Sequence, residues 1–507
     1  MRFADFALYR SIQSLLFNMM RGIRRTRRRT TTRFRMILNG RGWFIFAMLV
    51  GAYLLTLPTP EGLTPLGHRV LVMSIVATIL FVTEPIPLPA VALLMMVGQV
   101  FLLDTSSNDM AKSIMSDSVL FIMGSLMLAV AIVKQKLDKR IAFFIVKMTG
   151  TKTANICFGI SVVSGLMASV VGEHTVAAMM LPVAITLIRL TSEDAKQVRS
   201  LAAVLLFSIA YGCSVAGIST PSGGARNAIM IGFWQEFFYD KNDPTTYKYL
   251  VDYVSWVMYC FPVFIAQLML TSVIIQKTFK PEYHTLNRSV VKLRQQLAEQ
   301  GRMDLSDYTT IGIFFLTLIG WVFFSDTLGL GTIALLGSIC FLVFGLVKWE
   351  DINTNVNWGV ILLYGSAISL GIQMKDTGAA EWLASQIVDL LGYIGAEGGM
   401  SLWLTVSALT AGVTNTMSNG AAVAMLGPVT LKMAVVADES PLLMGYITAI
   451  SSAFAYLTVV GTPACTIVYS SGYLKSSDFL KVGWKMMIMS MFMLMLFAYF
   501  YWPLLGL

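Results

Sequence analysis

The sequence predicts an all-α polytopic membrane protein with about eleven transmembrane helices and two re-entrant hairpins in an inverted repeat. Three observations predict it: a charged fraction of only 13%, a mean hydropathy of +0.70, and repeated apolar stretches long enough to cross a bilayer. A soluble chain carries about 25% charged residues, so these 507 residues have too little polar surface to coat a water-soluble fold. Soluble enzymes, fibrous proteins and disordered proteins are therefore poor interpretations.

Eleven apolar segments are each consistent with one helical crossing. Two further apolar regions, 154–190 and 400–437, are interrupted midway by small and polar residues. A polar break at bilayer depth is tolerated only inside protein or along a cavity, so we expect two re-entrant hairpins with the breaks at their tips. The eleven segments are 43–58, 69–83, 88–104, 118–136, 200–216, 254–277, 308–325, 331–348, 357–374, 443–460 and 482–505.

Basic residues predict the orientation in a cell (inner) membrane, because positively charged loops stay cytoplasmic. The basic block 21–35 precedes the first apolar run, which has no small-residue cleavage site, so we expect a retained first helix and a cytoplasmic N-terminus. Holding this topology against anionic lipid explains the block better than nucleic-acid binding. The acidic segment 375–400 is expected outside. The basic loop residues that we place in the cytoplasm are Lys134, Lys136, Lys139, Arg140, Lys147, Lys152, Arg189, Lys196, Arg199, Lys280, Arg288, Lys292, Arg294 and Arg302.

Matching segments in nearly constant order predict the inverted repeat. The predicted organisation is a basic cytoplasmic arm at 1–42, a first repeat with its leading helix at 43–277, a cytoplasmic linker at 278–307 and a second repeat at 308–507. Interrupted helices in both halves of such a repeat are typical of the binding site of a secondary transporter. The matched pairs are 119–135 with 360–376, the tip Gly172–Glu173–His174 with Ser418–Asn419–Gly420, and the break at 218–229 with that at 459–469.

The tips and breaks offer groups that bind ions. Half-helix N-termini present N–H groups to anions, and exposed carbonyls coordinate small cations. Glu173 and His174 form an ionisable pair at the first tip, where charged groups are costly and usually functional. Arg226 at the break of the same repeat either binds an anionic substrate or neutralises Glu173 as a structural ion pair, and both readings stay open. Glu84, beside a proline-rich turn, is expected to have a capping or packing role.

An enzyme is not predicted. The sequence has no phosphate-binding P-loop and no nucleophile-elbow context. The five cysteines lie in apolar segments without metal-ligand spacing, so we expect neither a zinc site nor a disulfide framework, and no cofactor other than coupling ions.

Several motifs resemble the divalent anion/sodium symporter family, which includes di- and tricarboxylate and sulfate carriers. The resemblance covers about residues 43–505, and its most specific stretch is VGTPACTIVYSSGYLKSSDFLKVG at 460–483. The others are TEPIPLP at 83–89, AAMMLPVA at 177–184 and Ser418–Asn419. It implies homodimers in which each subunit has a scaffold domain and a transport domain that moves as an elevator.

The resemblance also implies site residues at the tips and breaks. The tips of that family carry Ser-Asn-Thr motifs that contact a substrate carboxylate and help form two sodium sites. This chain departs from them at Glu173, His174 and Gly420, and at Arg226, where the family has proline. The substrate residues expected here are Glu173, His174, Thr175, Arg226, Asn227, Ser418, Asn419, Thr462 and Pro463. The sodium residues expected are Gly172, Glu173, Ser219, Thr220, Ser418, Asn419, Gly461 and Thr462.

The leading hypothesis is a secondary active transporter of small divalent anions, such as succinate, malate or fumarate, driven by a sodium gradient. One alternative is proton-coupled transport or exchange of another anion, such as sulfate, sulfonate or citrate. A second is an anion channel on the same fold, which the clustering of polar groups at two tips disfavours. A third is an intramembrane hydrolase, which needs a metal or nucleophile partner for Glu173–His174.

Overall fold

The computed structural model describes residues 41–135, 150–192, 194, 196–287, 290–291, 304–459 and 461–507. The described residues form helices and no β-strand, apart from one isolated bridge between Lys152 and Thr285. Residues 1–40 of the predicted basic arm therefore lie outside the described residues. The same holds for the cytoplasmic placement of Lys136, Lys139, Arg140, Lys147, Arg288, Lys292, Arg294 and Arg302.

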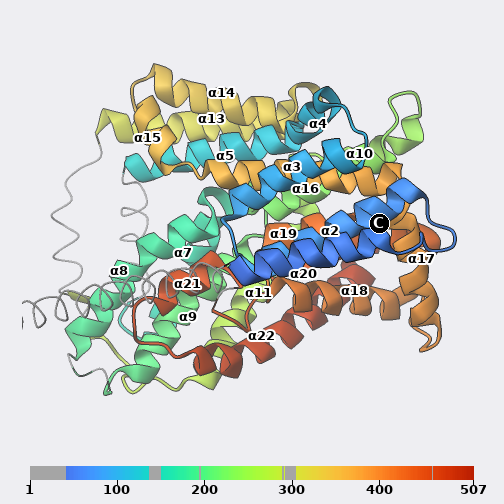
Figure 1. Ribbon diagram of the computed structural model, residues 1–507. Coiled ribbons are helices and arrows are strands. Elements are labelled where there is room, and N and C mark those ends of the chain that lie inside the picture. The colour runs from blue at the N-terminus through green and yellow to red at the C-terminus, as the bar shows by residue number, and fades with distance from the viewer. Residues whose placement is uncertain are drawn as a thin grey trace, which may run out of the picture.

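Helices lie at all eleven predicted crossing segments and in both predicted hairpins (Figure 1). In chain order they are Arg41–Thr56, α2 (Pro65–Thr83), α3 (Leu88–Leu102), α4 (Ser107–Ile114), α5 (Asp117–Lys134), α7 (Thr153–Val171), α8 (Glu173–Thr191), α9 (Arg199–Ala216), η1 (Pro221–Gly223), α10 (Ala225–Phe238), η2 (Pro244–Tyr249), α11 (Tyr253–Thr278), α13 (Leu305–Leu328), α14 (Leu330–Val343), α15 (Trp349–Asn355), α16 (Trp358–Asp376), α17 (Ala379–Gly392), α18 (Gly399–Thr414), α19 (Asn419–Val436), α20 (Pro441–Ser451), α21 (Pro463–Tyr469), α22 (Ser476–Leu496), η3 (Phe497–Tyr501) and η4 (Trp502–Leu505).

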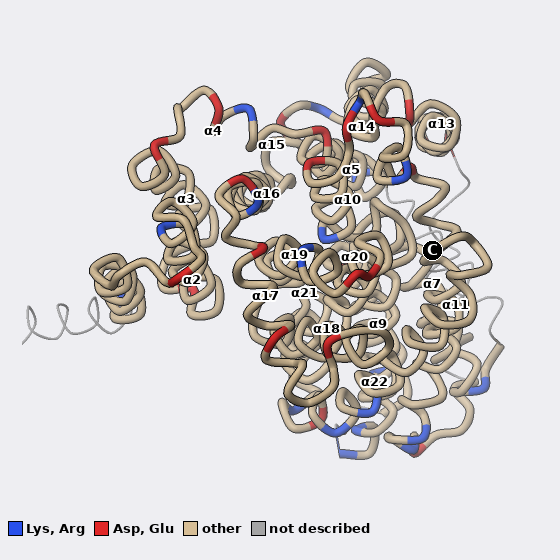
Figure 2. The backbone as a smooth tube through the Cα atoms, turned by 90° about the vertical axis from the view of Figure 1, so that its right-hand side faces the viewer, with Lys and Arg blue, Asp and Glu red and all other residues tan. Residues whose placement is uncertain are grey.

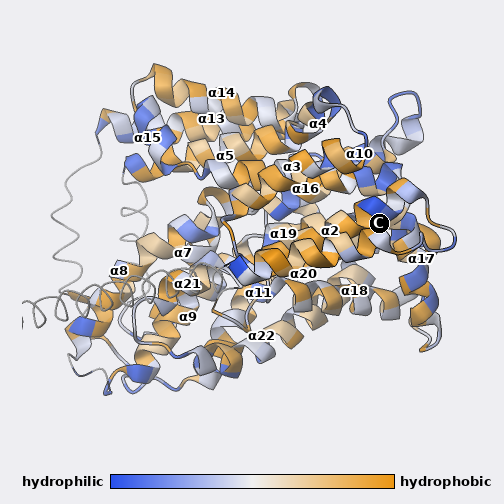
Figure 3. Ribbon diagram, in the orientation of Figure 1, coloured by the Kyte–Doolittle hydropathy of each residue, from blue (hydrophilic) through white to orange (hydrophobic). Residues whose placement is uncertain are grey.

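Nine helices of the described chain are long and apolar enough to cross a membrane, or ten if the bent pair α15–α16 forms one span. Six of the nine lie at predicted crossings, and the other three, α7, α8 and α19, are arms of the hairpins. The bent pair contains the predicted crossing 357–374, and the remaining four predicted crossings are shorter apolar helices: Arg41–Thr56, α3, α14 and α20. Figure 3 shows hydrophobic residues along most of the helices. Viewed down the helices in Figure 2, charged residues occupy only short stretches of a mostly uncharged tube. This distribution fits a protein that exposes its helices to lipid.

Local sequence explains where many helices begin. Thr64, Ser440 and Thr462 each accept a backbone N–H at the start of a helix whose first residue is proline. Proline suits the first helical position because its missing N–H has no intrahelical partner there. Asp304 and Asp307 form a reciprocal capping box at the start of α13.

Both interrupted regions are helical hairpins. The first joins α7 to α8 through Gly172, and the second joins α18 to α19 through residues 415–418. Each second arm contains a proline, Pro182 in α8 and Pro428 in α19. The hairpins therefore deliver two helix N-termini, those of α8 and α19, into the interior of the protein.

Each hairpin lies against a broken helix. In the first half α9 ends at Ala216 and α10 starts at Ala225, with η1 between them. In the second half α20 ends at Ser451, earlier than the predicted crossing 443–460, and α21 starts at Pro463. The early end has a physical cause: hairpin side chains bind the freed carbonyls, Thr414 that of Ser452 at 2.7 Å and Asn415 that of Phe454 at 3.1 Å.

Buried aromatic side chains fix the position of the first break. Trp256 of α11 donates from its indole nitrogen to the Ile218 carbonyl at 3.0 Å. Trp256 also packs on Tyr446, with ring centroids 5.2 Å apart, and on Trp234 of α10. A carbonyl freed where a helix stops thus has a partner in the core, as a buried backbone group requires.

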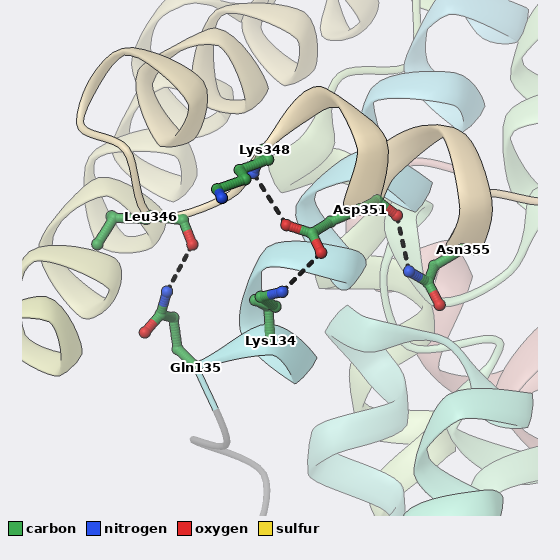
Figure 4. A network of polar contacts seen from close by, with 6 residues as sticks. All are labelled: Lys134, Gln135, Leu346, Lys348, Asp351 and Asn355. Carbon is green, nitrogen blue, oxygen red and sulfur yellow. Dashed lines mark hydrogen bonds and ion pairs between the residues drawn. The ribbon is translucent and has the colours of Figure 1, made fainter.

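A polar network holds the C-terminal end of α5 to the start of α15 (Figure 4). Lys134 Nζ lies 2.6 Å from Asp351 Oδ1, and Gln135 donates to the Leu346 carbonyl at 2.6 Å. Asp351 also accepts the Lys348 backbone N–H at 3.0 Å. The network lies just before the 63° bend between α15 and α16. It therefore ties α5 to the segment that leads into α16.

Candidate functional site

A cavity of about 330 Å³ lies where the two hairpin tips meet. Its lining comes from both tips, the N-terminal end of α10, α5 and α16. The α5 part of the lining is largely apolar, with Phe121, Ile122 and Leu126. Seven of the predicted site residues line the cavity: Gly172, Glu173, His174, Arg226, Ser418, Asn419 and Pro463.

The first tip places a carboxyl group at a helix N-terminus. Gly172 ends α7 and precedes α8 with φ +91°, a backbone conformation that favours glycine. Glu173 is then the first residue of α8, and its Oε2 atom is buried without a hydrogen-bond partner in the described structure. The helix N-terminus favours negative charge there. An unpaired buried carboxyl oxygen is nevertheless costly unless a proton, a cation or a ligand joins it.

The second tip places an amide at the corresponding point. Ser418 caps α19, and Asn419 is its first helical residue and is buried. The single hydroxyl hydrogen of Thr414 goes to the Ser452 carbonyl, so the Thr414 oxygen must accept from Asn419. In that amide orientation Asn419 Nδ2 donates to Thr414 Oγ1 at 2.8 Å and to the Ser452 carbonyl at 3.1 Å. Asn419 Oδ1 then accepts from Arg226 Nη1 at 2.7 Å.

Arg226 is the buried cation of the cavity. It is the second residue of α10 and only 3% exposed. Its Nε and Nη2 atoms have no hydrogen-bond partner in the described structure. No ion pair within 4.0 Å joins it to Glu173 among the described residues, although the two charges act on each other. A buried guanidinium with unpaired donors is strongly destabilising unless an anion reaches it, so the geometry leaves room for a ligand between these groups.

Glycines make room for the guanidinium. A Cβ atom on Gly217 would overlap Arg226 Nη2 and lie 2.9 Å from Cζ, and one on Gly224 would lie 3.2 Å from Cζ. Gly217 has an ordinary helical backbone, so a close approach rather than a special φ requires glycine there. Sequence reasoning missed this position, because nothing in a single sequence shows which side chain turns back toward it.

The other residues predicted in the first half lie behind the cavity wall. Asn227 is buried and donates from Nδ2 to the carbonyls of Gly217 and Thr220, both at 2.7 Å. Ser219 donates to Ser169 Oγ at 2.7 Å, and Thr220 donates to the Ser169 carbonyl at 2.5 Å. These hydroxyls are committed to protein partners, and the Asn227 amide already uses two of the break's carbonyls.

The second half shows a related arrangement. Thr458 donates to the carbonyl of Asn415 at 2.9 Å, as Thr220 does to that of Ser169. Both acceptors lie four residues before their tip residue, Asn419 or Glu173. Thr462 caps α21 by accepting the Cys465 N–H at 3.2 Å, and Gly461 precedes it and is buried. Among the described residues of this loop, Pro463 is the one that lines the cavity.

The remaining predicted residues lie beside the first tip. His174 lines the cavity and is exposed on one side, and its Nε2 atom lies 3.2 Å from Thr175 Oγ1. Thr175 itself does not line the cavity. Four polar residues that line it were not predicted as site residues: Ser125 on α5, Ser222 in η1, Asn357 just before α16, and Tyr364 on α16. Ser125 and Tyr364 lie in the matched segments 119–135 and 360–376, and Ser222 lies in the matched break at 218–229, which were the available signals.

The fold and this cavity define a class of protein. Paired hairpin tips and paired broken helices around a cavity are the architecture of a secondary transporter. Solved structures agree on the fold: the crystal structure of the Alcanivorax borkumensis YdaH transporter aligns with TM-score 0.52 at 14% identity, covering 84% of this chain and 99% of that one. The Neisseria gonorrhoeae MtrF structure aligns with TM-score 0.52 at 10% identity, covering 91% and 94%. The predicted all-α transporter fold is confirmed.

The chain belongs to the family whose model is described as the sodium:sulfate symporter transmembrane region, which matches residues 42–507. A sodium-dependent dicarboxylate transporter of Staphylococcus saprophyticus is 24% identical over 488 residues, covering 90% of this chain and 91% of the relative. Its counterpart in Staphylococcus aureus (strain USA300) is 24% identical over 474 residues, covering 88% of each chain. An uncharacterised Haemophilus influenzae transporter is 26% identical over 453 residues, covering 86% of this chain and 92% of that one. The predicted family resemblance is confirmed: this is a multi-pass membrane transporter of the divalent anion/sodium symporter group.

Proposed function

We propose that the protein is a secondary active transporter of small divalent anions, dicarboxylates such as succinate, malate or fumarate first, driven by a sodium gradient. The observation that carries the proposal is Arg226, whose buried Nε and Nη2 donors face a cavity without a partner. Guanidinium groups bind carboxylates through two parallel hydrogen bonds. The names of the Staphylococcus relatives support dicarboxylate as the substrate class.

The coupling cation is proposed to be sodium, bound near both tips. Carbonyl and hydroxyl oxygens of Gly172, Ser418 and Gly461, together with the Glu173 carboxylate, are the oxygen ligands that a small hard cation prefers. The cation organises the tips so that the anion binds well only alongside it, which is positive linkage between two sites. The remaining residues proposed for the two sites are Ser219, Thr220, Asn419 and Thr462 for sodium, and His174, Thr175, Asn227, Asn419 and Pro463 for substrate.

Protons are the second candidate for coupling, because of two observations at the first tip. Glu173 Oε2 is buried and unpaired, and a proton satisfies such an oxygen as well as a cation does. In addition, the carbonyls of Gly217 and Thr220 already accept from Asn227, which leaves fewer oxygens for sodium in the first half. Exchange of anions such as sulfate, sulfonate or citrate is the alternative if neither gradient drives uptake.

We further propose an elevator motion, a homodimer in the inner membrane and a cytoplasmic N-terminus. The lining of the cavity supports the motion, because it combines both tips and α10 with α5 and α16, which belong to neither hairpin. A channel is the alternative class, and the tight packing of α10 beyond Arg226 disfavours it. Phe233, further along the same helix, is fully buried against Gly371 and Gly427. The proposal includes no enzymatic activity; no cluster of metal-ligating side chains occurs within the described residues to assist a hydrolase.

The test is uptake of radiolabelled succinate into proteoliposomes, with inward sodium and proton gradients imposed separately. Stimulation by sodium alone supports sodium symport, and stimulation by protons alone makes Glu173 a proton site. Trans-stimulation by internal anion with neither gradient replaces symport by exchange. Failure of every dicarboxylate, combined with uptake of sulfate, would overturn the proposed substrate class. Single-channel-sized currents would favour the channel.

A further inference from the structure

We infer that Tyr364 donates its hydroxyl to the anion bound at Arg226, and that its ring limits the space beside the second tip. The inference rests on the function proposed above for the same cavity. The inference gives α16 a substrate contact and a role in substrate specificity, although this helix belongs to neither hairpin and neither break.

The first step is the position of the hydroxyl. Tyr364 lines the cavity that Arg226, Glu173 and Asn419 also line. Its side chain is half-buried, and its hydroxyl has no hydrogen-bond partner in the described part of the chain. Buried and partly buried tyrosine hydroxyls usually find a partner. A free phenol oxygen in the cavity that Arg226 also lines therefore fits a ligand that accepts its hydrogen.

The second step is the contact between Tyr364 and the second tip. A Cβ atom on Gly420 would lie 2.6 Å from the Tyr364 hydroxyl oxygen and overlap its ring. Gly420 is buried and does not have a positive φ, so the close approach of the ring is what requires glycine. The tyrosine thus occupies the space over the tip that a side chain at residue 420 would otherwise fill.

The third step is the charge around the phenol. Tyr364 lines the same cavity as Glu173 and Arg226, and both of these charges act electrostatically on its phenol. Arg226 offers Nε and Nη2 as free donors. A carboxylate has two oxygens in one plane, so it can accept from the guanidinium and from the phenol together. This arrangement favours a carboxylate over an anion that lacks a second acceptor within reach.

The same contacts predict strong discrimination. A site whose donors are built for a given acceptor rejects analogues that leave those donors unpaired. The ring, fixed against Gly420, also closes the cavity on that side, so bulk on the substrate near this carboxylate is excluded. Tyr364 is therefore a specificity-determining residue for the proposed transport.

The test measures binding of radiolabelled succinate to the purified full chain in detergent, with uptake in proteoliposomes as a second readout. Tyr364→Phe removes only the hydroxyl, and we expect the apparent Kd to rise about tenfold or more, the usual effect of losing a hydrogen bond to a charged group. The matched control is Tyr446→Phe, which removes an unpaired tyrosine hydroxyl that is buried in the aromatic core and does not line the cavity. Its Kd should be unchanged, and both variants should unfold at the same temperature as the unchanged protein without ligand.

A double-mutant cycle tests the contact with the tip. Gly420→Ala should weaken binding in the presence of Tyr364, because the new methyl group displaces the ring, and should have little effect in Tyr364→Ala. Equal effects in both backgrounds, or a Tyr364→Phe variant that binds succinate as the unchanged protein does, would overturn the role of Tyr364 but not the proposed function. Absence of dicarboxylate binding by the unchanged protein would instead overturn the proposed function together with it.

Discussion

Arg226 Nη1 donates to Asn419 Oδ1 at 2.7 Å, which joins the broken helix of the first half to the hairpin tip of the second. The amide of Asn419 is held in turn by Thr414 and by the Ser452 carbonyl, where α20 ends. One hydrogen-bonded chain thus connects α10, α18, α19 and the break after α20. The guanidinium keeps two donors free, so a ligand that binds Arg226 is connected through these hydrogen bonds to both halves of the protein.

Asn419→Ala tests this connection. The variant leaves Arg226 with a third unpaired donor and removes the restraint on its guanidinium. We expect the apparent affinities for substrate and for the coupling cation to fall together, each by about tenfold, since a charge-assisted hydrogen bond contributes about 1.5–3 kcal/mol. The concentration dependence of uptake measures both. Asn242→Ala, in an exposed loop, is the control. Unchanged affinities in Asn419→Ala would reject the role of the second tip.

Glu173→Gln tests the coupling site. Glutamine keeps the shape of the side chain and its place at the start of α8 but cannot ionise, so the fold should survive. We expect the sodium or pH dependence of transport to be altered or lost, whichever cation Glu173 binds. Uptake under separately imposed gradients measures it, beside Glu350→Gln as an exposed control. If uptake and its cation dependence persist in Glu173→Gln, the role given to this carboxyl group is wrong.

The sequence predicted the helical elements well because membrane burial leaves a strong local signal. Both tips were located from their small and polar residues, and the structure has hairpins there at Gly172 and at Ser418. The end of α20 was predicted less well. Its apolar composition continues past Ser451, and the chain leaves the helix because Thr414 and Asn415 of a distant hairpin bind its carbonyls. Such tertiary contacts are invisible to periodicity.

The candidate site was predictable in its residue types but not in its pairings. The sequence left open whether Arg226 neutralises Glu173, and the structure instead pairs Arg226 with Asn419, almost two hundred residues away. Tyr364 and Gly217 were not recognised, since an aromatic residue on an apolar helix and a glycine near a helix end have common structural explanations. Only the close approaches at Gly420 and Gly217 distinguish them.

A pH effect on stability is expected at Glu282, in the loop after α11. Burial opposes ionisation, but the backbone N–H groups of Ser200 and Leu201, at 2.8 and 2.9 Å, hold the pKa of this carboxyl below its usual value of 4.5. Since the folded pKa is lowered, the stabilisation is complete above pH 4.5 and is lost as the pH falls through the folded pKa. Because the side chain is exposed, the contribution is about 1 kcal/mol or less, as for other helix caps.

The measurement is the unfolding temperature of the purified protein from about pH 3 to about pH 7, because this range includes the usual pKa of glutamate. Glu282→Gln should lower this temperature at neutral pH, and the difference from the unchanged protein should vanish at the acid end. A difference that is constant across the range would mean that the carboxylate does not stabilise α9 through its charge.

Gly217→Ala tests whether anion binding requires the observed position of the Arg226 guanidinium and not only its charge. The backbone at Gly217 has φ −60° and ψ −11°, which alanine adopts without strain. Its methyl group, however, would overlap Arg226 Nη2, so the guanidinium must rotate away from Asn419. We expect anion affinity to fall by about tenfold or more, the size of a lost charge-assisted hydrogen bond, while the unliganded protein folds. The control is Gly412→Ala in α18, where an added Cβ meets no atom within 4 Å. If Gly217→Ala binds substrate as tightly as Gly412→Ala does, anion binding does not depend on the observed position of the Arg226 guanidinium. The proposed role of Arg226 in substrate binding would then be wrong.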